Sequence, residues 1–467
     1  NFLKISEISD ECMHINKIVW VRGRIYNIRS KGKNLFIVLR GNNGSTIQIV
    51  KFKGNDSNSE DNGKLIKFLG AVPLESVIEV QGNLVSAEVK ACTQKSAEIQ
   101  ILKAFVVSRA KSVLPILVED ASRSEKDIQT SQNTNRPFPR LGQEIRLDNR
   151  YIDLRTPANL AIMDIQSGVS RLFREYLYQH GFKEIHTPKL VAGESEGGSD
   201  VFRLDYFGAP ACLAQSPQIY KQMAISSDMG KVFEIGPVFR AENSNTRRHL
   251  CEFIGLDLEM EIYEHYNEVL VILHDLFKFI LGGLESGYVQ AISTVREQYE
   301  SEPVIFSNEP CIIHWPDAIE LLRENGYEAE DFDDLSGVQE LKLGEIVKKK
   351  YKTDFFIVDQ FPAKIRPFYT MPNPSDPRYS NSYDLFLRGQ EICSGAQRCH
   401  EPTKLLSIMK EKGVPYEPLK SYIECFKAGC VPHGGAGIGL ERVVFLYLGL
   451  DNVRKASMFP RDPKRCA

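Results

Sequence analysis

Hydrophobic and polar residues alternate in short runs through the first quarter of the chain. Alternation with a period of two is typical of strands that bury one face, and turn residues separate the runs. The pattern predicts five strands, at residues 18–26, 34–40, 46–52, 76–85 and 97–107. Five short consecutive strands favour a small β-barrel.

The same alternation predicts which barrel side chains face outward. In the second strand the leucines and the isoleucine take the core face, which turns Phe36, Val38 and Arg40 outward. Gln48 in the third strand and Glu98 in the last strand also face outward. An exposed aromatic ring beside polar groups can stack on unpaired bases and read their edges, so the pattern indicates an oligonucleotide-binding (OB) fold.

The second half of the chain mixes helical and strand patterns. Apolar residues recur at helical spacing over residues 162–176, and Gly181 stands where a helix cap is expected before a short strand that reaches residue 188. The clearest strand spans 253–262, with one apolar face and one carboxylate face. It is predicted to pair with 231–240 in an antiparallel hairpin whose long polar loop could hold a polyanion.

Composition divides the chain into three predicted parts. Residues 1–110 hold the barrel, residues 111–150 are a polar and irregular linker or hinge, and residues 151–467 form a catalytic domain. That domain is expected to be an antiparallel sheet flanked by helices, with an inserted helical lobe around 264–370. The fold class is therefore α+β.

Charge and cysteine content narrow the class of protein further. The net charge is −3, yet residues 12–55 contain no Asp or Glu and nine Lys or Arg, which indicates a surface for a phosphate backbone rather than an ordinary solvated face. No stretch approaches the roughly 20 apolar residues of a membrane span. Ten scattered cysteines without a Cys-x-x-Cys pair favour a reduced, cytoplasmic protein. The densest metal-like group, Cys425, Cys430 and His433, lacks zinc-finger spacing.

Three further segments resemble, in order, the signature motifs of class II aminoacyl-tRNA synthetases. They are the helix and strand that end in His-Thr-Pro at 186–188, Gly-Pro-Val-Phe-Arg-Ala-Glu at 236–242, and Gly-Ala-Gly-Ile-Gly-Leu-Glu-Arg at 435–442, expected as a glycine-rich turn that opens a helix. The first motif forms the dimer interface in that family. A homodimer is therefore expected, because the helix would leave an apolar surface uncovered in a monomer.

The resemblance also implies an ATP site. When a carboxylate attacks the α-phosphate, negative oxygens gather, and arginine suits this because it stays charged and binds phosphate with two hydrogen bonds. Arg240 and Arg442 are the implied catalytic residues, and Phe253 with Arg442 would enclose the adenine. The implied ATP-binding set is Arg240, Ala241, Glu242, Arg248, His249, Leu250, Phe253, Glu391, Gly439, Leu440, Glu441 and Arg442.

Magnesium is the implied cofactor, because it prefers hard oxygen ligands. Family resemblance assigns Glu391 and Ser394 to the ion, with Asp384 nearby, on a predicted hairpin. Strict alternation would place Glu391 and Ser394 on opposite faces, so we expect a β-bulge near Ser394 and Gly395. The alternative is that these are ordinary surface carboxylates.

Segments 193–199, 215–222 and 394–398 extend the resemblance, over essentially the whole chain, to aspartyl-tRNA synthetases of the eukaryotic and archaeal type. The implied aspartate-binding residues are Ser195 and Glu196 in a closing loop, Gln218 and Asp257 at the ammonium group, Lys221 and Arg398 at the side-chain carboxylate, and Ser394. Those implied to read the anticodon of the tRNA are Arg29, Phe36, Gln48 and Glu98.

Three other functions stay open at this point. An asparaginyl-tRNA synthetase would share the architecture, but the two cations Lys221 and Arg398 disfavour a neutral side chain. An aspartate–ammonia ligase would need no RNA-binding barrel. An inactive RNA-binding paralogue would not need to keep Arg240, Glu391, Ser394 and Arg442.

Overall fold

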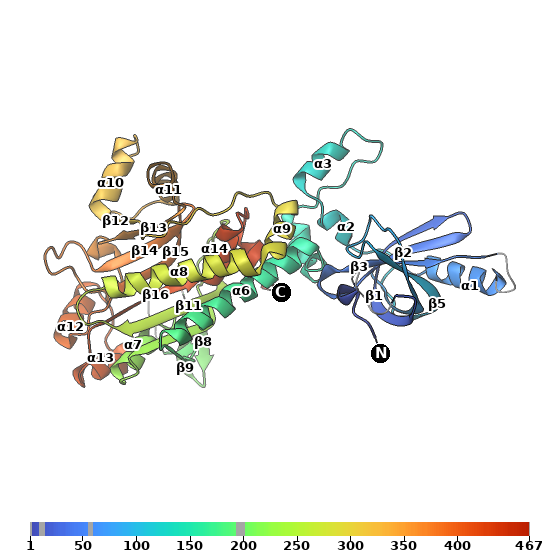
Figure 1. Cartoon of the computed structure of the whole chain (residues 1–467). Coiled ribbons are helices and arrows are strands. Elements are labelled where there is room, and N and C mark those ends of the chain that lie inside the picture. Colours follow the sequence, from blue (N-terminus) through green and yellow to red (C-terminus); the bar gives the residue numbers. More distant parts are fainter. Residues whose placement is uncertain (1, 9–14, 55–58, 193–200, 467) are drawn as a thin grey trace. The chain divides into compact units, whose positions relative to one another are not determined.

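The computed structural model describes residues 2–8, 15–54, 59–192 and 201–466. The chain forms two compact units, residues 1–160 and 161–467, which are described separately (Figure 1). None of the helices in the described part of the chain combines the length and the hydrophobicity that crossing a membrane requires.

The first unit contains the predicted barrel. Five strands close in the order β1-β2-β3-β5-β4, which confirms the OB-type architecture. The strands are β1 Ile18–Lys31, β2 Asn34–Arg40, β3 Thr46–Lys51, β4 Val77–Ser86 and β5 Ala97–Ser108. The alternating side chains expected inside, such as Leu35, Ile37 and Leu39, are fully buried.

Two features of the barrel differ from the sequence prediction. Helix α1 (Ser59–Gly70) precedes β4 and was missed because the segment before it is strongly polar. Arg40 does not face solvent: its guanidinium is buried and donates to both carboxylate oxygens of Glu75, at 2.9 and 2.7 Å. Arg155 also donates to Glu75, at 2.7 Å, so one carboxylate ties the barrel to the segment before α6.

The segment between barrel and sheet is more regular than its composition indicates. It contains short helices rather than an unstructured linker, and a capping box formed by Ser124 and Asp127 starts one of them. The elements that complete the first unit are η1 Ile5–Glu7, η2 Asn42–Gly44, α2 Val118–Ala121, α3 Glu125–Ser131, α4 Gln143–Asp148 and α5 Arg150–Asp153.

The second unit is built on an eight-stranded sheet in the order β12-β13-β14-β15-β16-β11-β10-β6. Pairing is antiparallel except at the two edges, where β12 is parallel to β13 and β6 is parallel to β10. The strands are β6 Lys183–Glu184, β10 Lys231–Phe239, β11 Glu252–Glu261, β12 Ile312–His314, β13 Phe355–Asp359, β14 Ser382–Leu387, β15 Gln390–Gln397 and β16 His433–Gly439. A small second sheet joins β7 Leu190–Val191, β9 Ala209–Leu213 and β8 Arg203–Tyr206.

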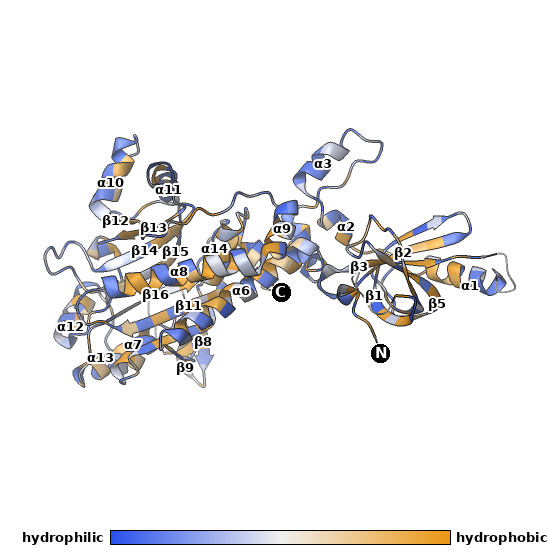
Figure 2. Ribbon diagram, in the orientation of Figure 1, coloured by the Kyte–Doolittle hydropathy of each residue, from blue (hydrophilic) through white to orange (hydrophobic). Residues whose placement is uncertain are grey.

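Helices α6 and α8 bury their apolar faces in the main core with β10 and β11, and alternating colours along both helices in Figure 2 mark their amphipathic character. Most apolar side chains of α6 are therefore covered within the protein itself, but Tyr178 near its end is 54% exposed. The expected dimer stays a prediction. The helices are α6 Pro157–Gln179, α7 Gln218–Ser226, α8 Asn267–Gly287, α9 Val289–Gln298, α10 Trp315–Glu324, α11 Gly337–Tyr351, α12 Pro402–Glu411, α13 Lys420–Lys427 and α14 Leu440–Tyr447, with 3-10 turns η3 Ala363–Ile365, η4 Glu417–Leu419 and η5 Val453–Ala456.

Residues 264–370 are largely helical, as expected, but they are joined to the main sheet rather than set apart as a lobe. Helix α8 belongs to the central core, and β12 and β13 extend the sheet at one edge. Helices α10 and α11 pack with β13 around Trp315 in a second apolar cluster. This arrangement brings α11 to the edge of the functional site.

Candidate active site

A cavity of about 330 Å³ opens over the central strands of the second unit. Of the residues named from the sequence, those that line it are Gln218, Arg240, Glu242, Arg248, His249, Leu250, Phe253, Asp257, Glu391, Ser394, Arg398, Gly439, Glu441 and Arg442. Ala241 and Leu440 do not line it, and Lys221 and Asp384 lie buried behind it. Ser195 and Glu196 fall outside the described residues.

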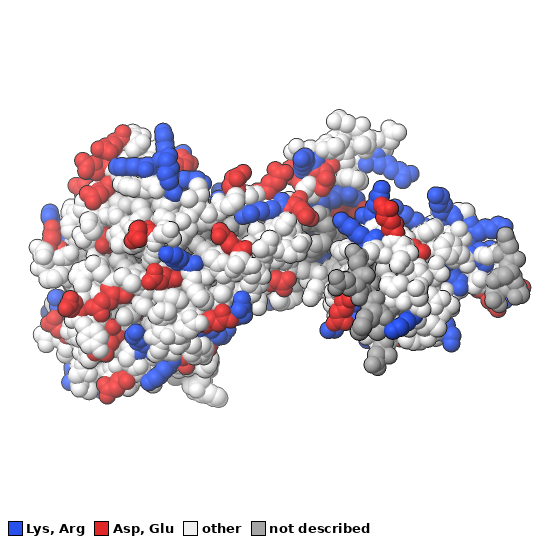
Figure 3. Space-filling model, in the orientation of Figure 1, with Lys and Arg blue, Asp and Glu red and all other residues white. Residues whose placement is uncertain are grey.

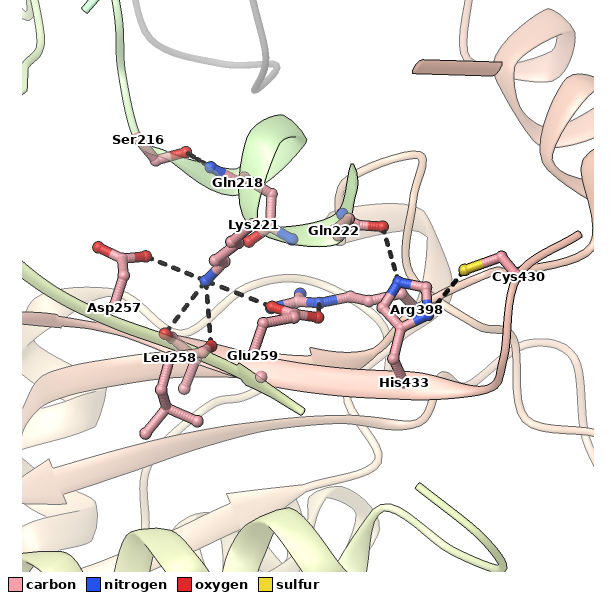
Figure 4. Close-up of polar contacts among 12 residues, drawn as sticks. Ser216, Gln218, Lys221, Gln222, Asp257, Leu258, Glu259, Arg398, Cys430 and His433 are labelled. Carbon is pink, nitrogen blue, oxygen red and sulfur yellow. Dashed lines mark hydrogen bonds and ion pairs between the residues drawn. The ribbon is translucent and has the colours of Figure 1, made fainter. Parts of the chain in front are cut away.

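Asp257 and Arg398 line one side of this cavity, and Lys221 and Glu259 are buried directly behind them; the four charged side chains, shown in Figure 4, are called here the charged wall. Arg398 Nε and Nη2 donate to the two oxygens of Glu259, at 2.9 and 3.2 Å. Lys221 Nζ donates to Asp257 Oδ1 at 3.0 Å and lies 3.5 Å from Glu259 Oε2. All four side chains are buried.

Glu259 is ionised in this environment. Burial alone would raise the pKa of its carboxyl, but Arg398 and Lys221 outweigh burial and lower the pKa below its ordinary value. Desolvation would by itself lower the pKa of Arg398, yet Glu259 raises it overall. The wall thus holds two cations and two anions. An incoming aspartate carboxylate would share Lys221 and Arg398 with acids already present, rather than meet two uncompensated cations.

The third motif is a strand rather than the glycine-rich turn expected from the sequence. Residues 433–439 form β16, which pairs with β11 on one side and β15 on the other, and α14 begins only at Leu440. A Cβ atom at Gly435 would lie 2.3 Å from Glu259 Oε2, and one at Gly437 would lie 3.1 Å from Asp257 Oδ1. Glycine in β16 therefore leaves the space that the acids of β11 occupy.

His433 supports the charged wall from behind. One ring nitrogen lies 2.8 Å from the carbonyl oxygen of Val431 and 3.7 Å from Cys430 Sγ, while the other lies 3.3 Å from Gln222 Oε1. Burial lowers the pKa of His433, although Glu259 opposes this. The histidine that the sequence grouped with Cys425 and Cys430 as metal-like thus takes part in a hydrogen-bond network.

Cationic side chains gather at the other end of the cavity. Arg240 extends from the end of β10, with its guanidinium carbon 5.6 Å from the centre of the Phe253 ring. Arg248 Nη1 donates to Glu340 Oε2 of α11 at 2.6 Å, and Arg442 Nη1 donates to the backbone oxygen of Glu391 at 2.9 Å. These arginines surround a space in which phosphate oxygens can be neutralised.

His249, in the same group, is uncharged near neutral pH. Burial is the largest cause of its lowered pKa, and Arg442 lowers it further. Burial likewise raises the pKa of Glu340 to about 7, with Glu391 adding repulsion and Arg248 opposing it. The cationic character of this end therefore comes from arginine rather than from histidine.

The candidate metal ligands meet at the β14–β15 hairpin, where Asp384 pairs with Ser394 across the strands. Cys393 faces Leu385 and Glu391 faces Phe386, so the extra residue is Ile392. A bulge is present as expected, but it lies there and not near Ser394 and Gly395. It allows both Glu391 and Ser394 to line the cavity.

These oxygens fit a magnesium site completed by substrate. Burial raises the pKa of Asp384 to about 6; Arg366, 2.7 Å from Asp384 Oδ2, opposes this, and Glu391 adds repulsion. A divalent cation would relieve that crowding of carboxylates. Among the described residues no three acidic, histidine or cysteine side chains form a cation cage by themselves. Magnesium usually needs only one or two carboxylates together with phosphate oxygens and water.

The barrel carries its own candidate interface. Gln48 Nε2 donates to Glu98 Oε2 at 2.8 Å across β3 and β5, and Arg29 pairs with Phe36 across β1 and β2. Phe52, which the sequence did not single out, lies edge-on to Phe36 with ring centres 6.4 Å apart and is exposed. Lys and Arg side chains are prominent over the barrel in the view of Figure 3, as the acid-free sequence window indicates.

Comparison with known proteins agrees with this geometry. A family model described as tRNA synthetases class II (D, K and N) matches residues 142–463. The chain belongs to this family. A second model, an OB-fold nucleic acid binding domain, matches residues 19–107 of the synthetase.

Similarities to individual proteins are more specific than the family match. The synthetase is 49% identical to the cytoplasmic aspartate–tRNA ligase of Caenorhabditis elegans, over 100% of this chain and 87% of the relative. An aspartyl-tRNA synthetase structure from Entamoeba histolytica superposes with a TM-score of 0.90 at 43% identity, covering 100% of this chain and 92% of that one. An asparaginyl-tRNA synthetase from Pyrococcus horikoshii, complexed with asparaginyl-adenylate, reaches a TM-score of 0.86 at 28% identity, covering 100% and 99%.

Three charged residues of the synthetase site were not assigned from the sequence. Glu259 holds Arg398, Glu340 holds Arg248, and Arg366 holds both Asp384 and the hydroxyl of Ser394, the latter at 3.3 Å. The strand pattern placed Glu259 on the same face as Asp257, which was a usable signal. Nothing in the sequence pattern marked Glu340 or Arg366.

Proposed function

We propose that this chain is a cytoplasmic aspartate–tRNA ligase that uses ATP to join L-aspartate to the tRNA for aspartate. The full-length similarity to cytoplasmic aspartate–tRNA ligases supports this proposal. The observation that carries the choice of amino acid is the charged wall, where Lys221 and Arg398 are buried beside the cavity. Arg398 and Lys221 present hydrogen-bond donors to this side of the site. A carboxylate can accept from them with both oxygens, whereas the amide of asparagine has one acceptor oxygen and would turn an NH2 donor towards these donors.

In the first step an oxygen of the α-carboxylate attacks the α-phosphorus of ATP, and the bond from that phosphorus to pyrophosphate breaks. Arg240 binds the α-phosphate and the carboxylate, and Arg442 with Arg248 binds the outer phosphates, so that charge is neutralised as it develops. Glu391 and Ser394 would hold Mg²⁺, which supplies Lewis-acid stabilisation of the phosphate oxygens.

In the second step a hydroxyl of the terminal ribose of tRNA attacks the carbonyl carbon of the adenylate, and AMP leaves. The anhydride is already activated, so holding the two reactants in line can supply most of the acceleration. The barrel residues Arg29, Phe36, Gln48 and Glu98 read the anticodon of that tRNA. Gln218 and Asp257 receive the ammonium end of aspartate.

We further propose that the enzyme is a homodimer whose interface includes the segment ending at residue 188. The support for this proposal is the resemblance of that segment to the first family motif. The apolar face of α6 adds little support, because most of it is buried in the core of the protein.

ATP–pyrophosphate exchange measured with each of the twenty amino acids tests the proposed activity. Exchange with aspartate alone, followed by transfer to a tRNA transcript with the aspartate anticodon, is the expected result. Exchange that is as fast with asparagine as with aspartate would refute the assignment.

A further inference from the structure

Glu441 is a buried carboxylate at the point where two strands of the central sheet part. Its side chain is 5% exposed, and its oxygens lie 3.0 and 3.3 Å from the backbone N of Ile254, which donates to them. Burial raises the pKa of Glu441 to about 7, although the Ile254 N–H opposes this. A carboxyl in such a costly position requires a compensating role.

The strand register explains why an acceptor is needed there. β11 and β16 pair as far as Gly255 and Gly439, after which β16 ends and the chain turns into α14. At the start of β11, a single bridge joins Glu252 to Arg461. The N–H of Ile254 falls between these pairings, and Glu441 supplies the acceptor that the next residue of a strand would have supplied.

The two residues joined by this contact are direct neighbours of two ATP-site side chains. Phe253 precedes Ile254 on β11, and Arg442 follows Glu441 on α14; both Phe253 and Arg442 line the cavity. The hydrogen bond thus links the backbone of β11 to the side chain of Glu441 at the start of α14.

We propose that Glu441 is a positioning residue that sets the width of the adenine slot between Phe253 and Arg442. The proposal rests on the proposed function, because it assumes that ATP is the nucleotide bound there. Glu441 acts through the backbone N–H of Ile254 and requires only an acceptor oxygen, not a negative charge. Loss of the acceptor lets the end of β11 and the start of α14 move apart, which weakens stacking without touching the charged wall.

The test compares Glu441→Met, which keeps the length of the side chain but removes the acceptor, with Glu441→Gln, which keeps an acceptor oxygen. KM for ATP should rise about five- to tenfold in Glu441→Met, the scale of one hydrogen bond, while KM for aspartate stays within about twofold. Glu441→Gln should recover most of the ATP affinity. Glu252→Gln is the matched control, because Glu252 is an exposed carboxylate on the same strand, whereas the Ile254 N–H donates to Glu441.

Three results would overturn the proposal: an unchanged KM for ATP in Glu441→Met, an equal rise in both KM values, or a loss in Glu441→Gln as large as in Glu441→Met. The last result would assign Glu441 a direct, charge-dependent contact with the nucleotide. If Glu441→Met does not fold, hydrogen exchange of the Ile254 amide in Glu441→Gln decides: protection near that of the wild type is expected, and its loss contradicts the proposal. Wild-type enzyme that activates no aspartate would instead refute the proposed function.

Discussion

Removal of Arg398 should destabilise the catalytic unit as well as abolish aspartate activation. Arg398→Leu takes both hydrogen bonds from Glu259, whose side chain is fully buried, and leaves Lys221 at 3.5 Å as the nearest cation. Removal of one partner of a buried pair typically costs about 3 to 5 kcal/mol. Because Lys221 remains close, we expect about 3 kcal/mol, the lower end of that range.

A second substitution separates charge from packing. In the double variant Arg398→Leu/Glu259→Leu no uncompensated carboxylate remains, so about 2 kcal/mol of the lost stability should return. Urea unfolding followed by tryptophan fluorescence measures both variants. Trp315 is fully buried in the second unit, and a Trp20→Phe background removes the other tryptophan, which lies in the barrel. A single variant as stable as the wild type, or a double variant less stable than the single one, would refute the reasoning.

The pH dependence of this loss has a defined sign. In the wild type the pKa of Glu259 is lowered, so its contribution to stability is complete above the unfolded value of 4.5 and is lost as pH falls towards the folded pKa. Without Arg398, burial dominates and raises that pKa, so the variant gains stability as the carboxyl protonates. The difference in stability between wild type and variant should therefore shrink from pH 7.5 to about 5.

Phe36→Ala should weaken tRNA binding by about 1 to 3 kcal/mol, the scale of one base–aromatic stack, and leave pyrophosphate exchange intact. Phe105→Ala, which removes an exposed ring stacked on Trp20 elsewhere on the barrel, is the control and should bind tRNA normally in a filter assay. Glu391→Ala should abolish exchange in magnesium with little change in melting temperature, whereas retained exchange would mean that the ion is held elsewhere. Sedimentation should give a dimer at micromolar concentration, and a stable monomer would contradict the proposed interface.

The barrel and the central hairpin could be predicted from the sequence because their signal is local. Alternating side chains in β2 and β11 face opposite sides whatever the rest of the chain does, so Leu35 and Leu258 could be assigned to the core. The alternation of polar and apolar residues did not predict the strand register where a single inserted residue changes it. The bulge at Ile392 is such a case, since alternation alone does not say where the register shifts.

Most of the site features that could not be predicted from the sequence are contacts between segments that are far apart in the chain. Glu340 lies 92 residues from Arg248 and belongs to a helix whose amphipathic pattern reports only its packing face. The sequence showed Glu259 as an acid on the polar face of a strand, which is also how a solvated acid appears. What distinguishes Glu259 is β16, which covers it, and that neighbour is 176 residues further on, at Gly435.

The glycine-rich strand β16 limits how the amino-acid site can change through mutation. A methyl group at Gly435 would meet Glu259 Oε2 at 2.3 Å, so even alanine there displaces a charge of the wall. Substitutions in β16 therefore cannot adapt the site to a different amino acid. The other candidate positions are residues whose charges compensate one another. Single substitutions among them leave an unpaired buried charge. A change of amino-acid specificity therefore requires paired substitutions. A stepwise path would pass through single variants that neither fold well nor select a substrate.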